Sequence, residues 1–223
     1  NGDFQPVSKY FSRRLANVDK LRRLPRLQAT RDELLEMGRI FGASQEDLFL
    51  DNRAKESLIR TKDLSIYRLI VFATHGIVNG DDGEVPQPGL VLTPPAIGSE
   101  SDDGLLTASE IAQMKLNADW VILSACNTAA SDGTPGGEAF SGLAKSFFYA
   151  GARTVLVSQW YIASKATAHL TTSLIQVLKE SPQIGKSKAL AEAMNKMIKE
   201  GRNSGWSHPA FWGPFSLVGD GWR

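Results

Sequence analysis

The sequence predicts an α/β fold with a mostly parallel central sheet. Three short apolar segments, rich in β-branched residues, alternate with longer segments in which apolar residues recur at helical spacing. Short apolar runs of this kind are typical of parallel strands that helices cover on both faces. The strands are predicted at 67–73, 120–123 and 154–157, with a last one at 215–218.

The helices are predicted from apolar spacing and from capping residues. Thr30 followed by Glu33 is typical of a capping box, and Gly42 would end the helix that they begin. Thr107 and Glu110 repeat the box before a short helix. A further helix is expected to begin at a cap at Asp51 or Asn52 and to extend to residue 59. Three more helices are expected at about 140–151, 165–180 and 187–199. Short strands are also expected at 48–50 and 89–93.

The composition bounds the class of protein. The chain has 223 residues, 42% of them hydrophobic, and 25 basic against 24 acidic residues give a net charge of +1. This balance argues against a direct nucleic-acid binder, and no apolar run reaches the roughly 18 residues of a membrane span. The length fits one large domain or two small ones, and either could bury a sizeable core. We expect a single domain over residues 1–223.

Cys126 is the only cysteine. A disulfide framework and a thiolate zinc cluster are therefore excluded, and a chain without disulfides fits the reducing cytoplasm. The chain begins at Asn1 without Met, and we expect it to be the C-terminal part of a longer protein. Residues 1–25 are basic, and we expect them to be irregular.

Two residues with catalytic chemistry follow neighbouring predicted strands. His75 comes after the strand at 67–73, and Cys126, 51 residues later, after the strand at 120–123. Functional crevices of parallel sheets lie at the carboxyl ends of the strands. A thiolate is a competent nucleophile, and an imidazole can take its proton. Either residue alone is more often structural, since a free Cys commonly packs as a small hydrophobe; their joint placement favours a catalytic pair.

Gly76 has no side chain to keep a substrate carbonyl away from its backbone N–H. Together with the amide of Cys126 it could form an oxyanion hole. No Gly-x-Ser-x-Gly elbow and no phosphate-binding loop is present in the sequence.

Six separated motifs carry a resemblance to a known family. They are FATHG at 72–76, LSACNT at 123–128, GEAFSGLA at 137–144, FYAGAR at 148–153, VSQW at 157–160 and HPAFWGPF at 208–215. The sequence resembles the CHAT peptidase family over nearly its whole length. These are caspase-like cysteine peptidase domains, related to separase and often found at the end of tetratricopeptide-repeat proteins. LPRL at 24–27 also resembles the segment that precedes the first helix of the family.

The resemblance implies a caspase-like three-layer α/β/α sandwich and cysteine endopeptidase activity on a protein or peptide substrate, without metal or cofactor. It makes His75 the base and Cys126 the nucleophile, with oxyanion donors from Gly76 and Cys126. It also implies regulation by a protein partner or by upstream tetratricopeptide repeats.

The resemblance places an extended substrate beside the strand end at Ser158, Gln159 and Trp160, by β-augmentation. The family usually reads Trp-Pro-Val-Asp at this point, whereas this sequence has Ala163 at the position of the Asp. Without that carboxylate, a neutral or apolar P1 residue is as well supported as a basic one.

Two other functions stay open from the residues. The domain could be a catalytically silent caspase-like scaffold that binds proteins, or an acyl-transfer enzyme that uses the same pair on a small molecule. The family also places a strand before a Gly-Asp-x-x-Pro-like segment, which residues 2–6 resemble. We therefore expect an interior strand from upstream of Asn1, or another segment in its place.

Overall fold

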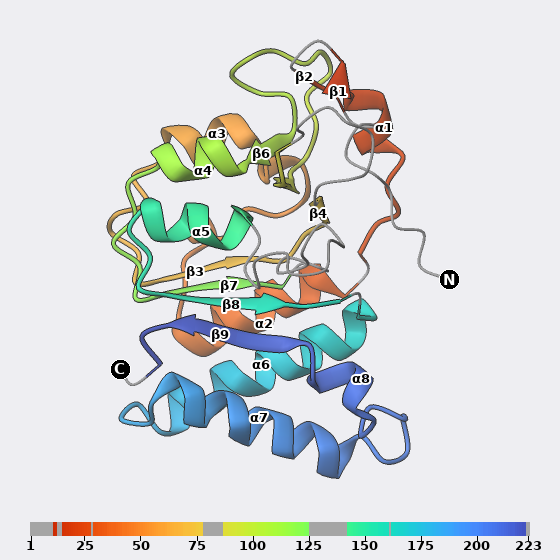
Figure 1. Ribbon diagram of the computed structural model, residues 1–223, viewed down its shortest axis with the longest axis vertical. Helices are drawn as coiled ribbons and strands as arrows, with labels where there is room; N and C mark the ends of the chain where they lie inside the picture. The colour runs from red at the N-terminus through yellow and green to blue at the C-terminus, as the bar shows by residue number, and fades with distance from the viewer. Residues whose placement is uncertain are drawn as a thin grey trace.

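A four-stranded sheet forms the central layer of the protein. The computed structural model describes residues 11–12, 15–27, 29–77, 87–124, 142–160 and 162–221. The strand order is β3-β7-β8-β9, with β3, β7 and β8 parallel and β9 antiparallel to β8 (Figure 1). These strands are Leu69–Phe72, Trp120–Leu123, Thr154–Ser158 and Phe215–Gly219. The predicted mostly parallel sheet is confirmed.

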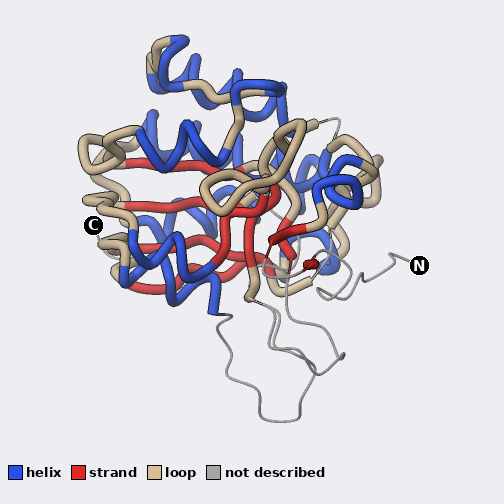
Figure 2. Tube along the Cα trace, turned by 90° about the horizontal axis from the view of Figure 1, so that it is seen from above, coloured by secondary structure: helices blue, strands red, loops and turns tan. Residues whose placement is uncertain are grey.

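Helices cover both faces of this sheet, and Figure 2 shows the strands as a layer between them. One face packs against α3 (Glu56–Thr61), α4 (Ala108–Gln113) and α5 (Gly142–Tyr149). The other packs against α2 (Thr30–Phe41), α6 (Ser164–Glu180) and α7 (Lys186–Glu200). The arrangement is therefore the three-layer α/β/α sandwich that the resemblance implied.

The interior strand β7 shows why the two cores form. Val121 and Leu123 point into the core under α3, α4 and α5, whereas Trp120 and Ile122 point into the core over α2, α6 and α7. Successive side chains of a strand alternate between faces, so an apolar run of four residues serves both cores. All four side chains are buried.

Smaller elements surround the carboxyl end of the sheet. β4 (Gly76–Ile77), β5 (Gly89–Val91) and β6 (Leu105–Thr107) form an antiparallel sheet, and β1 (Phe11–Ser12) pairs with β2 (Leu15–Ala16). α1 (Val18–Arg22) follows β2, and α8 (Pro209–Trp212) precedes β9. The expectation that residues 1–25 are irregular is wrong for the part described, because it forms β1, β2 and α1. Ala16 and Leu21 anchor these elements in a buried cluster with Leu105.

The segment at 48–50 is not a strand, so this prediction is wrong. It runs between two short 3-10 turns, Gln45–Asp47 and Asp51–Arg53. Asp51 adopts a left-handed backbone, with φ of 48°, which an extended strand cannot continue through. α3 then begins at Glu56, later than a cap at Asp51 or Asn52 would have placed it.

The predicted capping box of α2 is also wrong. The helix is preceded by Ala29 and has no side-chain cap. The Thr30 hydroxyl donates instead to the carbonyl of Leu27 at 2.9 Å. Glu33 turns into the protein, where 3% of it is exposed. Gly42 ends the helix as predicted, with φ of 69°.

Among the described residues, no strand pairs with the outer edge of β3. Its residues Leu69, Ile70 and Val71 are only partly buried, although they are apolar. Parallel strands are normally covered on both faces, whereas β3 keeps part of its apolar surface accessible. The strand that we expect from upstream of Asn1, or from another segment, remains a prediction for this position.

The second predicted capping box is confirmed and makes a stability prediction. The Thr107 side chain accepts from the N–H of Glu110, and the Glu110 carboxylate accepts from the N–H of Thr107 at 2.9 Å. Thr107→Ala should lower the free energy of unfolding by about 1 kcal/mol, measured by urea denaturation. Thr61→Ala is the matched control: its exposed hydroxyl only bonds carbonyls of its own helix, and its effect should stay within about 0.5 kcal/mol. Equal losses would contradict the cap.

Candidate active site

The sheet places His75 just beyond one end of β3, beside the end of β7, the strand that precedes Cys126 in the sequence. In the parallel β3–β7 pair, Phe72 lies opposite Leu123. His75 comes three residues after Phe72, and Cys126 three residues after Leu123. Neighbouring strands lie about 4.8 Å apart. Cys126 itself lies outside the described residues, so the register, and not a measured distance, connects it with His75.

His75 is held by backbone contacts on both sides. Its ring Nε2 lies 2.7 Å from the carbonyl oxygen of Pro25, and its own carbonyl accepts from the N–H of Val91 at 2.9 Å. The preceding Thr74 donates its hydroxyl to the carbonyl of Val91. The imidazole is thus fixed between the segment before α2 and the sheet formed by β4 and β5.

The Pro25 contact determines the tautomer of the ring. A carbonyl oxygen only accepts, so Nε2 carries the hydrogen that it donates. In the neutral imidazole, Nδ1 is then the nitrogen with a free lone pair. A histidine held in this way can accept a proton at Nδ1 while its other nitrogen stays hydrogen-bonded.

Pro25 is a functional candidate that the sequence reasoning missed. The LPRL segment at 24–27 resembles the family pattern, but the resemblance assigns no role to it. The contribution comes from a backbone carbonyl, which leaves no residue-type signal. The segment is anchored by Arg26, which forms an ion pair with Asp51 at 2.5 Å, and by Leu24, which packs on a buried apolar cluster.

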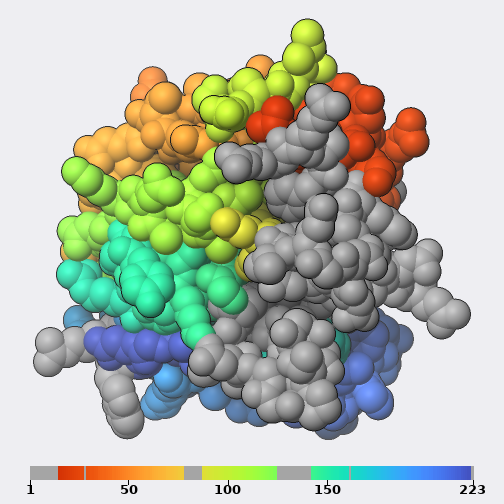
Figure 3. All heavy atoms as spheres, turned by 45° about the horizontal axis from the view of Figure 1, so that its top comes forward, coloured from red at the N-terminus to blue at the C-terminus, as the bar shows by residue number. Residues whose placement is uncertain are grey.

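Gly76 begins β4 and lies opposite Leu90 of β5. Its position directly after His75 keeps it at the carboxyl end of β3. The space-filling view shows the chain around β4, drawn in yellow, reaching the surface near the middle of that face (Figure 3). Its use as an oxyanion donor remains a prediction, since the other expected donor belongs to Cys126.

The four predicted substrate-binding residues follow or end β8, whose carboxyl end points the same way as those of β3 and β7. Ser158 is 1% exposed and lies opposite Phe215. The N–H of Gln159 donates to the carbonyl of Pro214 at 2.9 Å. Of these four residues, Trp160 and Ala163 are the exposed ones.

Trp160 is 44% exposed, although its indole N–H donates to the carbonyl of Ala210 at 3.0 Å. Ala163 is exposed and precedes α6, where its carbonyl accepts from the N–H groups of Ala166 and Thr167. An anchored, exposed indole can offer an apolar surface to a bound chain. The position of Ala163 brings no charge to this surface.

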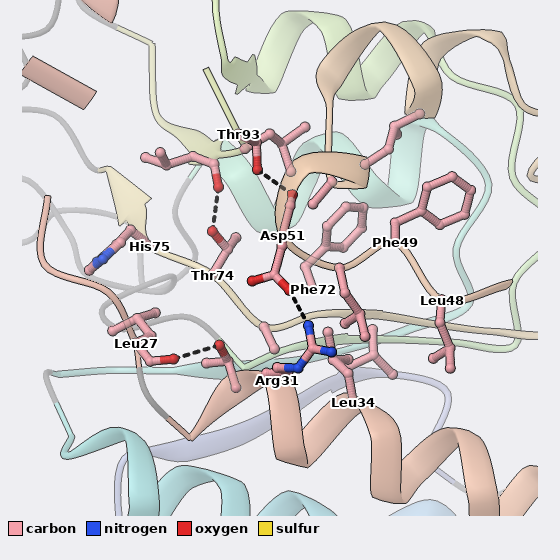
Figure 4. A pocket seen from close by; sticks show the side chains of 18 of the residues that line it. Leu27, Arg31, Leu34, Leu48, Phe49, Asp51, Phe72, Thr74, His75 and Thr93 are labelled. Carbon is pink, nitrogen blue, oxygen red and sulfur yellow. Dashed lines mark hydrogen bonds and ion pairs between the residues drawn. The ribbon is translucent and has the colours of Figure 1, made fainter. Parts of the chain in front are cut away.

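A pocket of about 630 Å³ runs along the outer edge of β3. Figure 4 shows His75 and Thr74 at one end and Phe49 and Leu48 at the other. The lining is largely apolar, and the ion pair between Arg31 and Asp51 lies between these two ends. The pocket therefore connects the predicted base with the unpaired strand edge.

A buried carboxyl lies where α2 packs against α6. Glu33 accepts from the hydroxyl of Thr171 of α6 at 2.6 Å. Burial raises the pKa of Glu33 from 4.5 to about 7, and the hydroxyls of Ser124 and Thr171 partly oppose this rise. Residue type and spacing do not indicate this burial, because Glu33 also fits a capping box.

The described part of the chain contains neither a metal-binding cluster nor a membrane-spanning helix. No group of three or more His, Cys, Asp or Glu side chains there is placed to hold a metal ion. No helix in those ranges combines the length and apolar character that crossing a bilayer requires.

Comparison with known proteins gives a family and two relatives. The CHAT domain family matches residues 8–220 of the chain. A stretch of 119 residues is 34% identical to tetratricopeptide repeat protein 28 of Mus musculus, and covers 52% of this chain and 4% of that protein. The Homo sapiens protein of the same name is 35% identical over the same length and coverage. The chain thus matches only a small part of these relatives.

Proposed function

Because this chain belongs to the CHAT domain family, we propose that it is a cysteine endopeptidase with His75 as base and Cys126 as nucleophile. The observation that supports this most is the register of β3 and β7. It gives His75 and Cys126 the same offset beyond the adjacent residues Phe72 and Leu123. Acyl transfer requires a base within hydrogen-bond reach of the nucleophile, and neighbouring strand ends are close enough to allow this.

The proposed reaction proceeds through an acyl-enzyme. The Cys126 thiol gives its proton to Nδ1 of His75, and the sulfur forms a bond to the carbonyl carbon of the substrate. The C–N bond then breaks, and the leaving amine takes the proton back from the imidazolium. Water adds to the thioester, gives a proton to His75, and releases the carboxylic acid as the thiol is restored.

Two backbone groups would assist this reaction. The Pro25 carbonyl, 2.7 Å from Nε2, would hold the ring and stabilise the imidazolium that forms. The N–H groups of Gly76 and Cys126 would stabilise the developing oxyanion, a contribution that typically exceeds that of any other single group. No step requires a metal or a cofactor.

The substrate would be a protein segment in an extended conformation near the end of β8. Since the N–H of Gln159 already donates to Pro214, this amide is not available to pair with the substrate. Trp160 would instead supply an apolar surface. With Ala163 in place of an acidic residue, a neutral P1 residue is as well supported as a basic one.

Regulation and location are part of the proposal. The relatives are named as tetratricopeptide repeat proteins, which supports an upstream repeat region or a partner protein as the regulator. We propose that this chain is the C-terminal part of such a protein and that it acts in the cytoplasm.

A peptide-library cleavage assay on the full-length protein tests the proposal, run beside Cys126→Ala and repeated with cell extract to supply an activator. Cleavage should fall by about 10³-fold or more in the variant, and the products identify P1. Absence of cleavage under both conditions, with partner binding unchanged in Cys126→Ala, would overturn the peptidase and favour a protein-binding scaffold.

A further inference from the structure

One aspartate connects the two segments that hold His75. Asp51 lies in the turn between α2 and α3, and its carboxylate accepts from the guanidinium groups of Arg26 and Arg31. Its backbone carbonyl accepts from the hydroxyl of Thr93 at 2.6 Å. Figure 4 shows the contacts of Asp51 with Arg31 and Thr93, on the same side of the pocket as His75. The proposed reaction assigns no role to this aspartate.

The first of these segments contacts the ring of His75. Arg26 directly follows Pro25, whose carbonyl oxygen lies 2.7 Å from Nε2 of His75. Arg26 donates to the Asp51 carboxylate at 2.5 Å, so the residue beside the ring contact is tied to the turn between α2 and α3. A single exposed ion pair contributes little. Here, however, one carboxylate joins Arg26 to Arg31 of α2, which gives the segment a fixed point on a helix.

The second segment contacts the backbone around His75. The N–H of Val91 donates to the His75 carbonyl at 2.9 Å, and the Val91 carbonyl accepts from the hydroxyl of Thr74. Thr93 comes two residues after Val91 and donates its hydroxyl to the carbonyl of Asp51. Asp51 therefore holds the chain on both sides of His75, with its side chain on one and its backbone on the other.

The backbone of Asp51 shows what the side chain adds. Its φ is 48°, and no other non-glycine residue of the described ranges has a positive φ. Glycine adopts this conformation without strain, whereas aspartate tolerates it at some conformational cost. Strained residues of this kind persist where the surrounding structure holds them, and they occur often at functional sites. The carboxylate that joins Arg26 to Arg31 is the group that glycine would lack.

We propose that Asp51 is a positioning residue for His75, which fixes the segment that presents the Pro25 carbonyl to Nε2 of the ring. Through this segment it keeps the hydrogen on Nε2 and the lone pair on Nδ1, the arrangement that the proposed reaction uses. The inference rests on the proposed function only for the catalytic role of His75.

Carbethoxylation of histidine by diethyl pyrocarbonate tests this without any substrate. The reagent acylates a ring nitrogen with a free lone pair, which Nε2 of His75 lacks while it donates to Pro25. Asp51→Asn removes the charge and keeps a residue that tolerates the left-handed backbone. It should raise the His75 rate by about threefold or more, because a released ring can carry its hydrogen on either nitrogen. Mass spectrometry of the full-length protein resolves each histidine, and His208 is the internal reference.

Asp119 provides a matched control at the other end of the sheet. It directly precedes β7, and its carboxylate also accepts from two arginines, Arg68 and Arg153. Its side chain is 35% exposed, against 37% for Asp51. Asp119→Asn therefore removes a comparable group of ion pairs, and it should leave the carbethoxylation rate of His75 unchanged.

Two further variants test the route from Asp51 to His75. Arg26→Gln removes the other half of the pair and should raise the His75 rate as Asp51→Asn does, and the double variant should show no further rise. Asp51→Gly keeps the left-handed backbone without a carboxylate and should give the same rise. The result then does not depend on how asparagine fits. Far-ultraviolet circular dichroism confirms that each variant is folded.

The inference is overturned if the His75 rate in Asp51→Asn and Asp51→Gly equals that of the wild type, or if Asp119→Asn raises it equally. Carbethoxylation needs no peptide cleavage, so a raised rate in a protein that cleaves nothing would support the positioning of His75 and count only against the proposed reaction. In a protein that cleaves, Asp51→Asn should lower kcat by about threefold or more with KM nearly unchanged, because the base moves and the substrate surface does not.

Discussion

Replacing His75 by alanine is expected to lower kcat/KM for peptide cleavage by about 10³-fold or more. Without the imidazole, the Cys126 thiol has no base at the adjacent strand end, and the leaving amine has no acid. The measurement is the initial rate on the best peptide from the library, with alkylation of Cys126 as a second readout. The double variant His75→Ala with Cys126→Ala should be no slower than the single variants, because the pair acts as one unit.

His75→Gln distinguishes a base from a structural histidine. A glutamine amide can still donate a hydrogen bond toward Pro25, but it cannot accept the thiol proton. If His75 is the base, this variant should be as slow as His75→Ala. If His75 only holds the segment before α2 through its 2.7 Å contact, glutamine should restore much of the rate.

His208→Ala serves as the control for removing a histidine. His208 is exposed, and its Nδ1 accepts from the N–H of Ala210 at 3.2 Å at the start of α8. The cleavage rate should be unchanged in this variant at temperatures well below its unfolding. A loss comparable to that of His75→Ala would contradict a specific role for His75.

The strands could be predicted from the sequence because their signal is local. Apolar runs such as 120–123 and 154–157 contain β-branched residues that suit a strand buried on both faces, and both lie at the centre of the sheet. The failure at 48–50 has a physical cause. The run is apolar, but the left-handed Asp51 that follows ends the extended backbone.

Side-chain contacts across the fold could not be predicted in the same way. Thr30 and Glu33 have the spacing of a capping box, and so do Thr107 and Glu110. The second pair forms the box, whereas tertiary packing draws Glu33 toward Thr171, 138 residues later in the chain. A local pattern does not specify whether a carboxylate will turn back to its own helix or inward to another.

The candidate site also combines features that the sequence predicts with a contact that it does not predict. The sequence predicts His75 and Cys126 at one sheet edge, because strand ends in a parallel sheet share an edge, and the described residues place His75 and the end of β7 there. The Pro25 carbonyl at Nε2 of His75 depends on how the chain between α1 and α2 crosses that edge. Such a contact uses an atom that every residue has, so residue types alone cannot reveal it.

The stability of the protein should fall as the pH rises from about 4.5 to 7, and Glu33 should account for part of the loss. In the unfolded chain Glu33 ionises near its ordinary pKa of 4.5, whereas in the folded protein burial raises this pKa to about 7. Between these values only the unfolded state releases the proton, so increasing pH favours unfolding. The full difference corresponds to about 3 kcal/mol at 1.36 kcal/mol per pKa unit.

Urea denaturation of Glu33→Gln at several pH values measures this contribution. Glutamine cannot ionise, so the variant should gain stability relative to the wild type from about pH 4.5 upward and level off above about pH 7. Glu36→Gln is the matched control on the same helix. The Glu36 side chain is 41% exposed, and its hydrogen bond with Arg39 lowers its pKa. The stability that Glu36 contributes is therefore lost only as the pH falls below its ordinary pKa. The difference in free energy of unfolding between Glu33→Gln and wild type could instead stay constant from about pH 4.5 to 7. That result would contradict the prediction, because it would show that Glu33 has the same pKa in the folded protein as in the unfolded chain.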